Sequence, residues 1–133
     1  MARSFPVLLL AGFFLVAPSH AQSTLKTGDV ISGKLHVVRT HHPNGTPITA
    51  YQIVADQPKK FAKPDEFCNE GEAPKTFHLA VIGDDSKATW ARLKQLVGKH
   101  IAVVAEDFVC SHTAWHIGDA VVLKWHFAEP AKH

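Results

Sequence analysis

The chain has 133 residues, with 14 Lys and Arg against 12 Asp and Glu, so its formal net charge is +2 with histidine neutral. This near balance gives no electrostatic reason to expect nucleic acid as a partner. The length predicts one domain of ordinary size.

The first 21 residues have the organisation of a secretory signal peptide. Arg3 supplies a basic start, residues 7–17 are apolar, and residues 19–21 form a small-x-small cleavage sequence. The apolar run is shorter than the roughly 20 residues that a transmembrane helix needs. No cysteine follows it, which argues against a lipoprotein. We therefore expect residues 1–21 to be cleaved and residues 22–133 to be a periplasmic or secreted protein without a membrane span.

The mature chain is rich in histidine. Removing Arg3 and His20 leaves 13 basic residues against 12 acidic ones, together with nine histidines. The positive charge should therefore increase as the pH falls from about 7 to 5.

Alternating apolar positions predict the first two strands. Apolar and polar side chains alternate, as in half-buried strands, over residues 30–39, VISGKLHVVR, and again over residues 50–56. Between them, residues 40–49 carry an Asn-Gly pair flanked by prolines, which is typical of a turn. The two strands should form an antiparallel hairpin. Residues 57–74, with three prolines, should form a long surface loop.

One helix and three more strands follow. Apolar and polar positions alternate over residues 75–82, which predicts a third strand. The GDDS sequence at residues 83–86 then offers N-cap candidates for a helix that ends at Gly98. Residues 100–109 and 120–127 predict the last two strands. The apolar faces of the helix and of the last strand should pack into the protein core, through Trp90, Leu93, Leu96, Val97 and Trp125. His36, His78 and His126 should lie on solvated strand faces.

Five strands with one helix between the third and the fourth give the element order of the OB-fold, a small Greek-key barrel. Other α+β arrangements share this order. A closed barrel also removes the exposed strand edges that endanger a small β-protein. We therefore predict a mainly β protein with a five-stranded OB-like barrel over residues 22–133.

Cys68 and Cys110 are the two cysteines of the chain. In an oxidising compartment a disulfide between them is the expected state. Two thiolate metal ligands are the alternative, but neither cysteine belongs to a C-x-x-C pair.

The predicted binding residues lie in two loops. In an OB-fold the loops joining strands one to two and four to five flank the binding face. Here these loops contain His41, His42, Asn44, His112, Trp115 and His116. Trp115 is either an exposed anchor for a partner or a plug over the barrel end, and we favour the plug.

The four loop histidines also suit zinc or copper, because neutral imidazole binds both metals well. The candidate ligands are His41, His42, His112 and His116. Zinc sites commonly add a carboxylate or a thiolate, and the carboxylates that lie near the second loop in sequence are Asp119, Glu106 and Asp107. Metal binding is thus the alternative to a role in recognition.

Catalysis has one candidate, the adjacent pair Ser111 and His112. Adjacent side chains of an extended segment point in opposite directions, so the hydroxyl and the imidazole should not meet. No nucleophile elbow, H-E-x-x-H motif or phosphate loop is present in the sequence. The sequence therefore favours a protein that is not an enzyme, and an exported hydrolase that uses Ser111 as nucleophile is the alternative.

In the second half of the chain, LVGK at residues 96–99 is followed by a strand, then by His112-Thr113 with a second histidine and a short apolar strand. This pattern resembles a bacterial family, domain of unknown function 4431. VISGKL and the Tyr51 strand, followed by proline and Cys68, extend the resemblance over most of the mature chain. In that family the loop is richer in consecutive histidines, whereas Trp115 and Ile117 stand here, which weakens a metal site. The resemblance implies a small exported bacterial domain and no particular reaction.

Together these patterns predict an exported, monomeric binding module that engages a protein or a small ligand through the two loops. An inhibitor or immunity-type protein is one version of it. Nucleic acid is disfavoured as a partner, because export and near-neutral charge argue against it.

Overall fold

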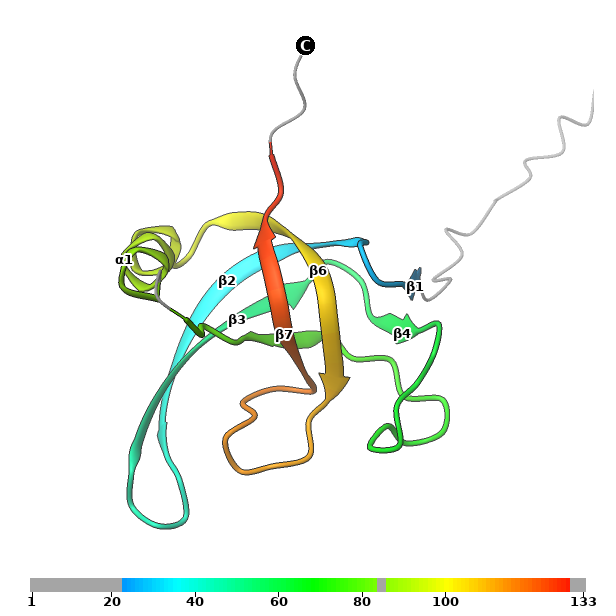
Figure 1. Ribbon diagram of the computed structural model, residues 1–133, viewed down its shortest axis with the longest axis horizontal. Coiled ribbons are helices and arrows are strands. Elements are labelled where there is room, and N and C mark those ends of the chain that lie inside the picture. Colours follow the sequence, from blue (N-terminus) through cyan, green and yellow to red (C-terminus); the bar gives the residue numbers. More distant parts are fainter. Residues whose placement is uncertain (1–22, 84–85, 130–133) are drawn as a thin grey trace, which may run out of the picture.

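The computed structural model describes residues 23–83 and 86–129 (Figure 1). The signal peptide predicted for residues 1–21 lies outside the described residues, as do the N-cap candidates Asp84 and Asp85. In chain order the elements are β1 (Ser23–Leu25), β2 (Val30–His41), β3 (Pro47–Ala55), β4 (Lys59–Phe61), β5 (Thr76–Leu79), α1 (Ser86–Leu96), β6 (His100–Cys110) and β7 (Ala120–Phe127).

Five of the strands close into a barrel, in the order β2-β3-β5-β7-β6. All neighbouring pairs are antiparallel except β5 and β7, which run parallel. In the chain, α1 follows β5 and precedes β6, and in Figure 1 it lies to one side, beside the start of β6. The prediction of a mainly β protein built on a small five-stranded barrel is confirmed.

The barrel interior is filled by the apolar side chains of alternate strand positions. Ile31, Leu35, Ile53, Phe77 and Val103 are all 0% exposed. Leu93 is the buried residue of α1, and Trp90, Leu96 and Trp125 pack against the core while partly buried. Val97 was expected on the same helical stripe, but it is 37% exposed because α1 ends at Leu96.

Two glycines allow local geometry that another residue would prevent. At Gly33 a Cβ atom would come within 2.0 Å of the carbonyl oxygen of Val54. The close approach of the β2 and β3 backbones at this position therefore requires glycine. Gly98 has a φ of +85°, and its N–H donates to the carbonyl of Leu35. It ends the helix as predicted and ties the helix end to β2.

The hairpin is longer than predicted. β2 continues to His41, which pairs with Pro47, so the connecting loop is only residues 42–46. His41 is therefore a strand residue and not a loop residue. Because β3 pairs with β5 only from Gln52 to Val54, the end of the hairpin projects beyond the barrel (Figure 1).

The segment predicted as one long loop contains a strand. β4 pairs in parallel with β1, which places Leu25 beside Phe61, and both side chains are buried. Farther along the same segment, Cys68 forms a disulfide with Cys110 at the end of β6, as predicted. This bond is consistent with an oxidising, exported environment. Within the described residues, no helix has the length and apolar character needed to cross a membrane.

Candidate functional site

The β2–β3 loop and the β6–β7 loop meet at one end of the barrel, drawn at the bottom of Figure 1. The contact between them is a ring stack, in which the imidazole of His42 lies on the indole of Trp115 with centroids 4.0 Å apart and an interplanar angle of 23°. Two segments that are distant in sequence are thus joined at their exposed tips.

The β2–β3 loop is a tight turn built on Asn44 and Gly45. The N–H of Thr46 donates to Oδ1 of Asn44 over 2.9 Å, and the N–H of Asn44 donates to Nδ1 of His42 over 3.1 Å. Gly45 has a φ of +90°, which favours glycine. Asn44, predicted as a binding residue, therefore shapes the turn that presents His42.

The β6–β7 loop is closed by hydrogen bonds at its base. Oγ of Ser111 donates to the carbonyl of Gly118 over 2.6 Å, and Nε2 of Gln52 on β3 donates to the carbonyl of Ile117 over 2.9 Å. Nδ1 of His112 lies 3.0 Å from the carbonyl oxygen of Cys110. The hydroxyl of Ser111 and the ring of His112 thus bond different carbonyls and do not form a nucleophile and base pair in this geometry.

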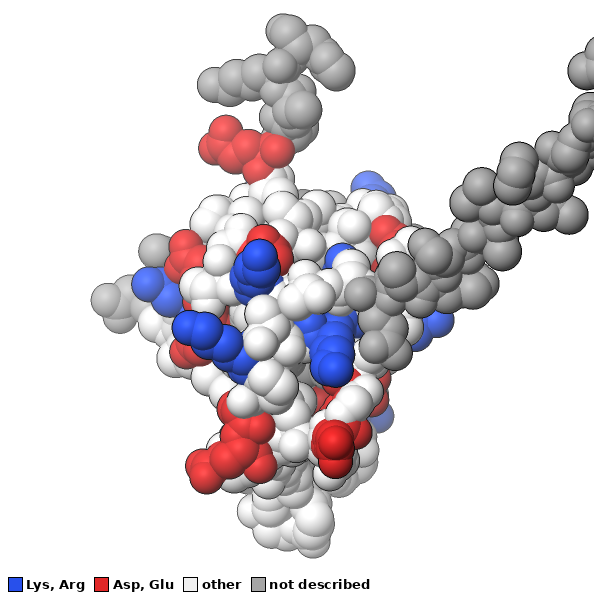
Figure 2. Space-filling model, turned by 90° about the vertical axis from the view of Figure 1, so that its right-hand side faces the viewer, with Lys and Arg blue, Asp and Glu red and all other residues white. Residues whose placement is uncertain are grey.

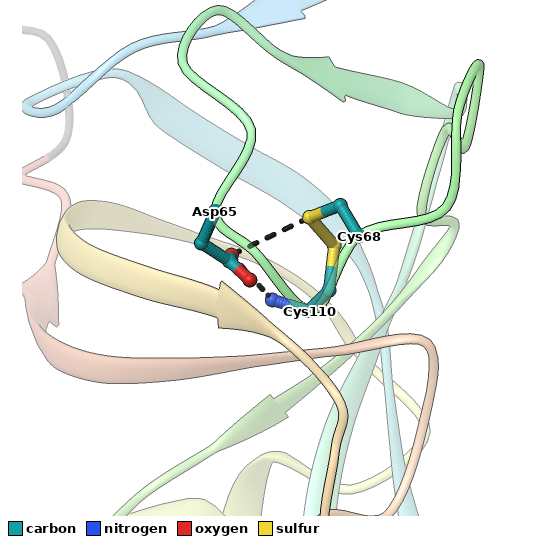
Figure 3. A group of neighbouring side chains, drawn as sticks. All are labelled: Asp65, Cys68 and Cys110. Atoms are coloured by element: carbon teal, nitrogen blue, oxygen red, sulfur yellow. Dashed lines mark hydrogen bonds between the residues drawn. A yellow bond between two sulfur atoms is a disulfide. The ribbon is translucent and has the colours of Figure 1, made fainter.

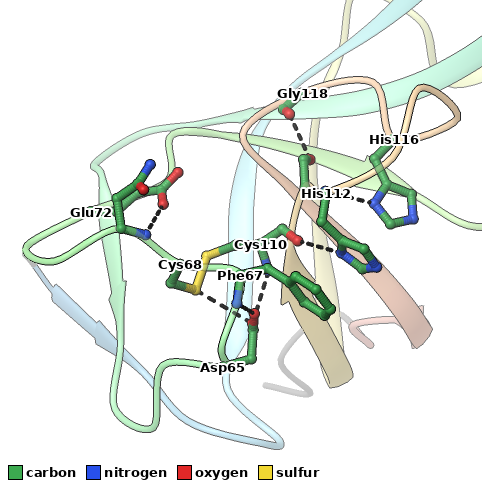
Figure 4. The surroundings of a disulfide bond; sticks show 10 residues. Asp65, Phe67, Cys68, Glu72, Cys110, His112, His116 and Gly118 are labelled. Carbon is green, nitrogen blue, oxygen red and sulfur yellow. Dashed lines mark hydrogen bonds between the residues drawn. A yellow bond between two sulfur atoms is a disulfide. The ribbon is translucent and has the colours of Figure 1, made fainter.

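A second ring stack continues the surface on the other side of the loop. Phe67 lies on His112 with centroids 3.7 Å apart and an interplanar angle of 9°, and His112 meets the edge of His116 at 4.6 Å (Figure 4). Sequence patterns did not identify Phe67. Its position beside Cys68, which was predicted to bond Cys110, was the signal that could have placed it near His112.

We call the surface formed by His42, Phe67, His112, Trp115 and His116 the loop surface. Trp115 is 46% exposed and Phe67 is 44% exposed. Trp115 stacks on His42 at the surface, so the expectation that it plugs the barrel end is wrong.

Asp65 positions Phe67 against the barrel. Its Oδ1 accepts the N–H of Phe67 over 2.9 Å (Figure 4), and its Oδ2 accepts the N–H of Cys110 over 2.9 Å (Figure 3). The same Oδ2 lies 3.4 Å from Sγ of Cys68. This carboxylate and the disulfide together fix the 62–74 segment beside β6.

The four predicted metal ligands are not gathered into one site. Among the described residues, Asp65, Cys68 and Cys110 are the one set of three potential ligands whose ligand atoms lie within 4.8 Å of one another. Both sulfurs of that set are in the disulfide, so neither is a thiolate. His41, His42, His112 and His116 form no such set. The geometry therefore supports stacking, rather than metal chelation, by the loop histidines.

His78 on β5 belongs to the support of the loop surface. It was expected to be solvated, but it is partly buried, and its Nδ1 accepts the N–H of Ile117 over 3.1 Å. Burial lowers the pKa of His78, and the nearby His116 lowers it further. Burial, then the nearby His112, likewise lowers the pKa of His116. The neutral form of both rings is thus favoured in the folded protein.

Fixed charge is missing from the loops themselves. Residues 40–55 and 111–118 contain no Lys, Arg, Asp or Glu. Residues 57–74 carry Lys59, Lys60 and Lys63 and then four acidic residues, Asp65, Glu66, Glu70 and Glu72. Figure 2, which views the side of β1 and β4, shows acidic side chains on the lower half of that face and an uncharged tip below them. At neutral pH the loop surface is therefore aromatic and uncharged, with acidic groups on one side.

Comparison of the chain with models of known protein families, with curated proteins and with solved structures finds no match.

Proposed function

We propose that the protein is an exported binding module, and not an enzyme, that engages a protein or a small ligand through the loop surface. The observation that carries the proposal is the pair of ring stacks, His42 on Trp115 and Phe67 on His112, which join three separate segments at one exposed end. Half-exposed aromatic side chains on a fixed support are typical of binding hot spots.

The support of these rings is rigid, which favours binding. The loop surface rests on a closed barrel, a disulfide and the hydrogen bonds of Asp65, Asn44 and Gln52. A surface that is ordered before binding loses less conformational entropy when a ligand arrives.

We also infer that the barrel is of the OB type. Renumbered within the barrel alone, its strand order is 1-2-3-5-4, with the third and fifth strands parallel and the helix between the third and the fourth in the chain. Loops one to two and four to five are the binding loops of OB-folds, and these are the two loops that meet through His42 and Trp115. From its resemblance to domain of unknown function 4431, we also propose that the protein is a small exported bacterial domain.

The lack of charged side chains in the two loops limits the kinds of partner that they can bind. A polyanion such as nucleic acid needs Lys or Arg along its path, and the two loops contain neither. Aromatic and imidazole ring faces instead suit an uncharged surface of a protein or a small molecule. An inhibitor or immunity-type protein, which blocks another exported protein, fits this description.

The test begins with the oxidised protein as bait for the exported proteins of its source cells. A captured protein is identified by mass spectrometry, produced separately, and its affinity is measured by calorimetry. Phe67→Ala and Trp115→Ala should each weaken binding at least about 10-fold, since hot-spot truncations cost above about 1.4 kcal/mol. Ile82→Ala is the matched control, because Ile82 is an apolar residue that is 77% exposed outside the loop surface. Equal affinity in all three variants would contradict the proposal.

A further inference from the structure

Three backbone N–H groups of the two loops donate to the Nδ1 atom of a histidine. Asn44 donates to His42 over 3.1 Å, and His112 donates to His116 over 3.2 Å. Ile117 donates to His78 over 3.1 Å. An imidazole accepts at Nδ1 only while that nitrogen carries no proton, so each of these rings must be neutral, with its proton on Nε2. All three bonds are lost when the rings become protonated.

His112 has the opposite arrangement. Its Nδ1 faces the carbonyl oxygen of Cys110 at 3.0 Å, and a carbonyl can only accept. His112 therefore carries a proton on Nδ1, and a second proton on Nε2 leaves this bond intact. When His112 becomes charged, its charge opposes protonation of the neighbouring His116.

No carboxylate is paired with these rings in the described part of the chain. The His–carboxylate pairs there are His100 with Asp56 and His126 with Glu106, both outside the loop surface. Asp65 accepts the N–H groups of Phe67 and Cys110, and Asp119 accepts those of Lys75 and Thr76. His78 is flanked on its sheet by the uncharged Gln52 and Val121. His42 faces the uncharged ring of Trp115.

We propose that the loop surface is a proton-controlled switch, ordered at neutral pH and released from the barrel in mild acid. Protonation of His42, His78 and His116 replaces three acceptors with three donors that face N–H groups. The imidazolium charges also repel one another in loops that contain no carboxylate. Burial opposes protonation of His78 and His116 in the closed form, whereas a free imidazole titrates near pH 6.5, so opening becomes progressively more favourable as the pH falls below about 6.5. Loss of a bound partner in acid is the further consequence, and only that consequence rests on the proposed function.

The experiment is NMR of the ¹⁵N-labelled, oxidised protein between pH 7.5 and 5.0, in buffer with EDTA and without any ligand. At pH 7.5 the ring nitrogens of His42, His78 and His116 should show the proton on Nε2, and those of His112 the proton on Nδ1. At pH 5.0 the N–H of Ile117 should lose at least about 10-fold in protection from hydrogen exchange, after correction for the intrinsic rate. The N–H of Gly28, which donates to the carbonyl of Ala105 in the barrel, is the internal control.

The variant His78→Asn isolates one contact. The Oδ1 atom of asparagine can take the place of Nδ1 as an acceptor, and it does not titrate in this range. In this variant Ile117 should keep its protection at pH 5.0, while Asn44 and His112 still lose theirs. An Nδ1–H form of His42, His78 and His116 at pH 7.5, or unchanged protection of Ile117 in the wild type when His78 is protonated, would overturn the proposal. Because no ligand is present, a failure to find any partner would leave this result unaffected.

Discussion

His42 and Trp115 stack on each other although each is held by the hydrogen bonds of its own loop. Asn44 donates its N–H to the ring of His42, and the N–H of Trp115 donates to Oγ1 of Thr113 over 3.2 Å. The stack at 4.0 Å therefore joins two turns that are already formed. It contributes to the shape of the surface more than to the stability of the barrel.

The two tryptophans should differ in their effect on stability. Trp115→Ala should lower the free energy of unfolding by no more than about 1 kcal/mol, since the side chain is 46% exposed. Trp125→Ala should cost about 3 kcal/mol, because Trp125 packs against the core and donates from Nε1 to the carbonyl of Ala80 over 2.7 Å. Urea unfolding of both variants measures this difference. A larger cost at Trp115 would mean that it serves the core.

Replacing Asp65 tests the support of Phe67. Asp65→Asn keeps one acceptor oxygen where two now accept the N–H groups of Phe67 and Cys110, so we expect a loss of about 1–3 kcal/mol in the free energy of unfolding. Glu66→Gln at the exposed neighbouring position is the control and should change stability by less than about 0.5 kcal/mol. Both values come from denaturant titration of the oxidised proteins. Equal stability of the two variants would argue against the positioning role of Asp65.

The stability of the whole protein should fall in mild acid. The pKa values of His78 and His116 are lowered by folding, so the unfolded chain binds more protons than the folded one below about pH 6.5. Their contribution is complete above that pH and is lost as the pH decreases toward their lowered pKa values. The pKa of Asp56 is lowered chiefly by its hydrogen bond to His100, so its contribution is lost only in stronger acid. Urea unfolding at pH 8, 7, 6 and 5 measures this, and a free energy of unfolding that does not decrease between pH 7 and 5 would contradict it.

Zinc and copper should not be retained by the protein. The four loop histidines form no set of ligand atoms within 4.8 Å, so a tight site would require the loops to move. Native mass spectrometry of the untagged, oxidised protein with one equivalent of either metal should therefore show the metal-free mass. One ion retained per chain, and lost in the double variant His112→Ala and His116→Ala, would restore the metal-binding hypothesis.

The sequence was most informative where one face of an element is buried over several residues. Alternation along β2, β3 and β7 predicted the barrel strands, and Gly98 predicted the end of the helix. β1 and β4 were not predicted, because three residues are too few for a periodic pattern and their pairing joins distant segments. The end of β2 was placed too early, since the Asn-Gly pair and its flanking prolines indicated a turn over residues 40–49, whereas pairing continues to His41 and Pro47.

The candidate site was predicted in part, for a related reason. Knowledge of the OB-type element order placed the two loops together, and the two cysteines predicted the disulfide. The partners of individual rings could not be predicted, because stacks such as Phe67 on His112 depend on side-chain directions set by long-range contacts. His78 was misplaced since its strand alternation indicates solvent, whereas the β6–β7 loop folds back over it through Ile117.

The lack of Lys, Arg, Asp and Glu in residues 40–55 and 111–118 also sets the kinetics of encounter. A partner that approaches these loops at neutral pH meets no charged side chain in them, so its association rate should be near that of unsteered docking, about 10⁵–10⁶ M⁻¹s⁻¹. Any effect of added salt should then come from the acidic groups of residues 57–74 beside the loop surface. As the histidines gain protons, the same encounter becomes sensitive to ionic strength, and a partner that carries positive charge is then repelled before it makes contact.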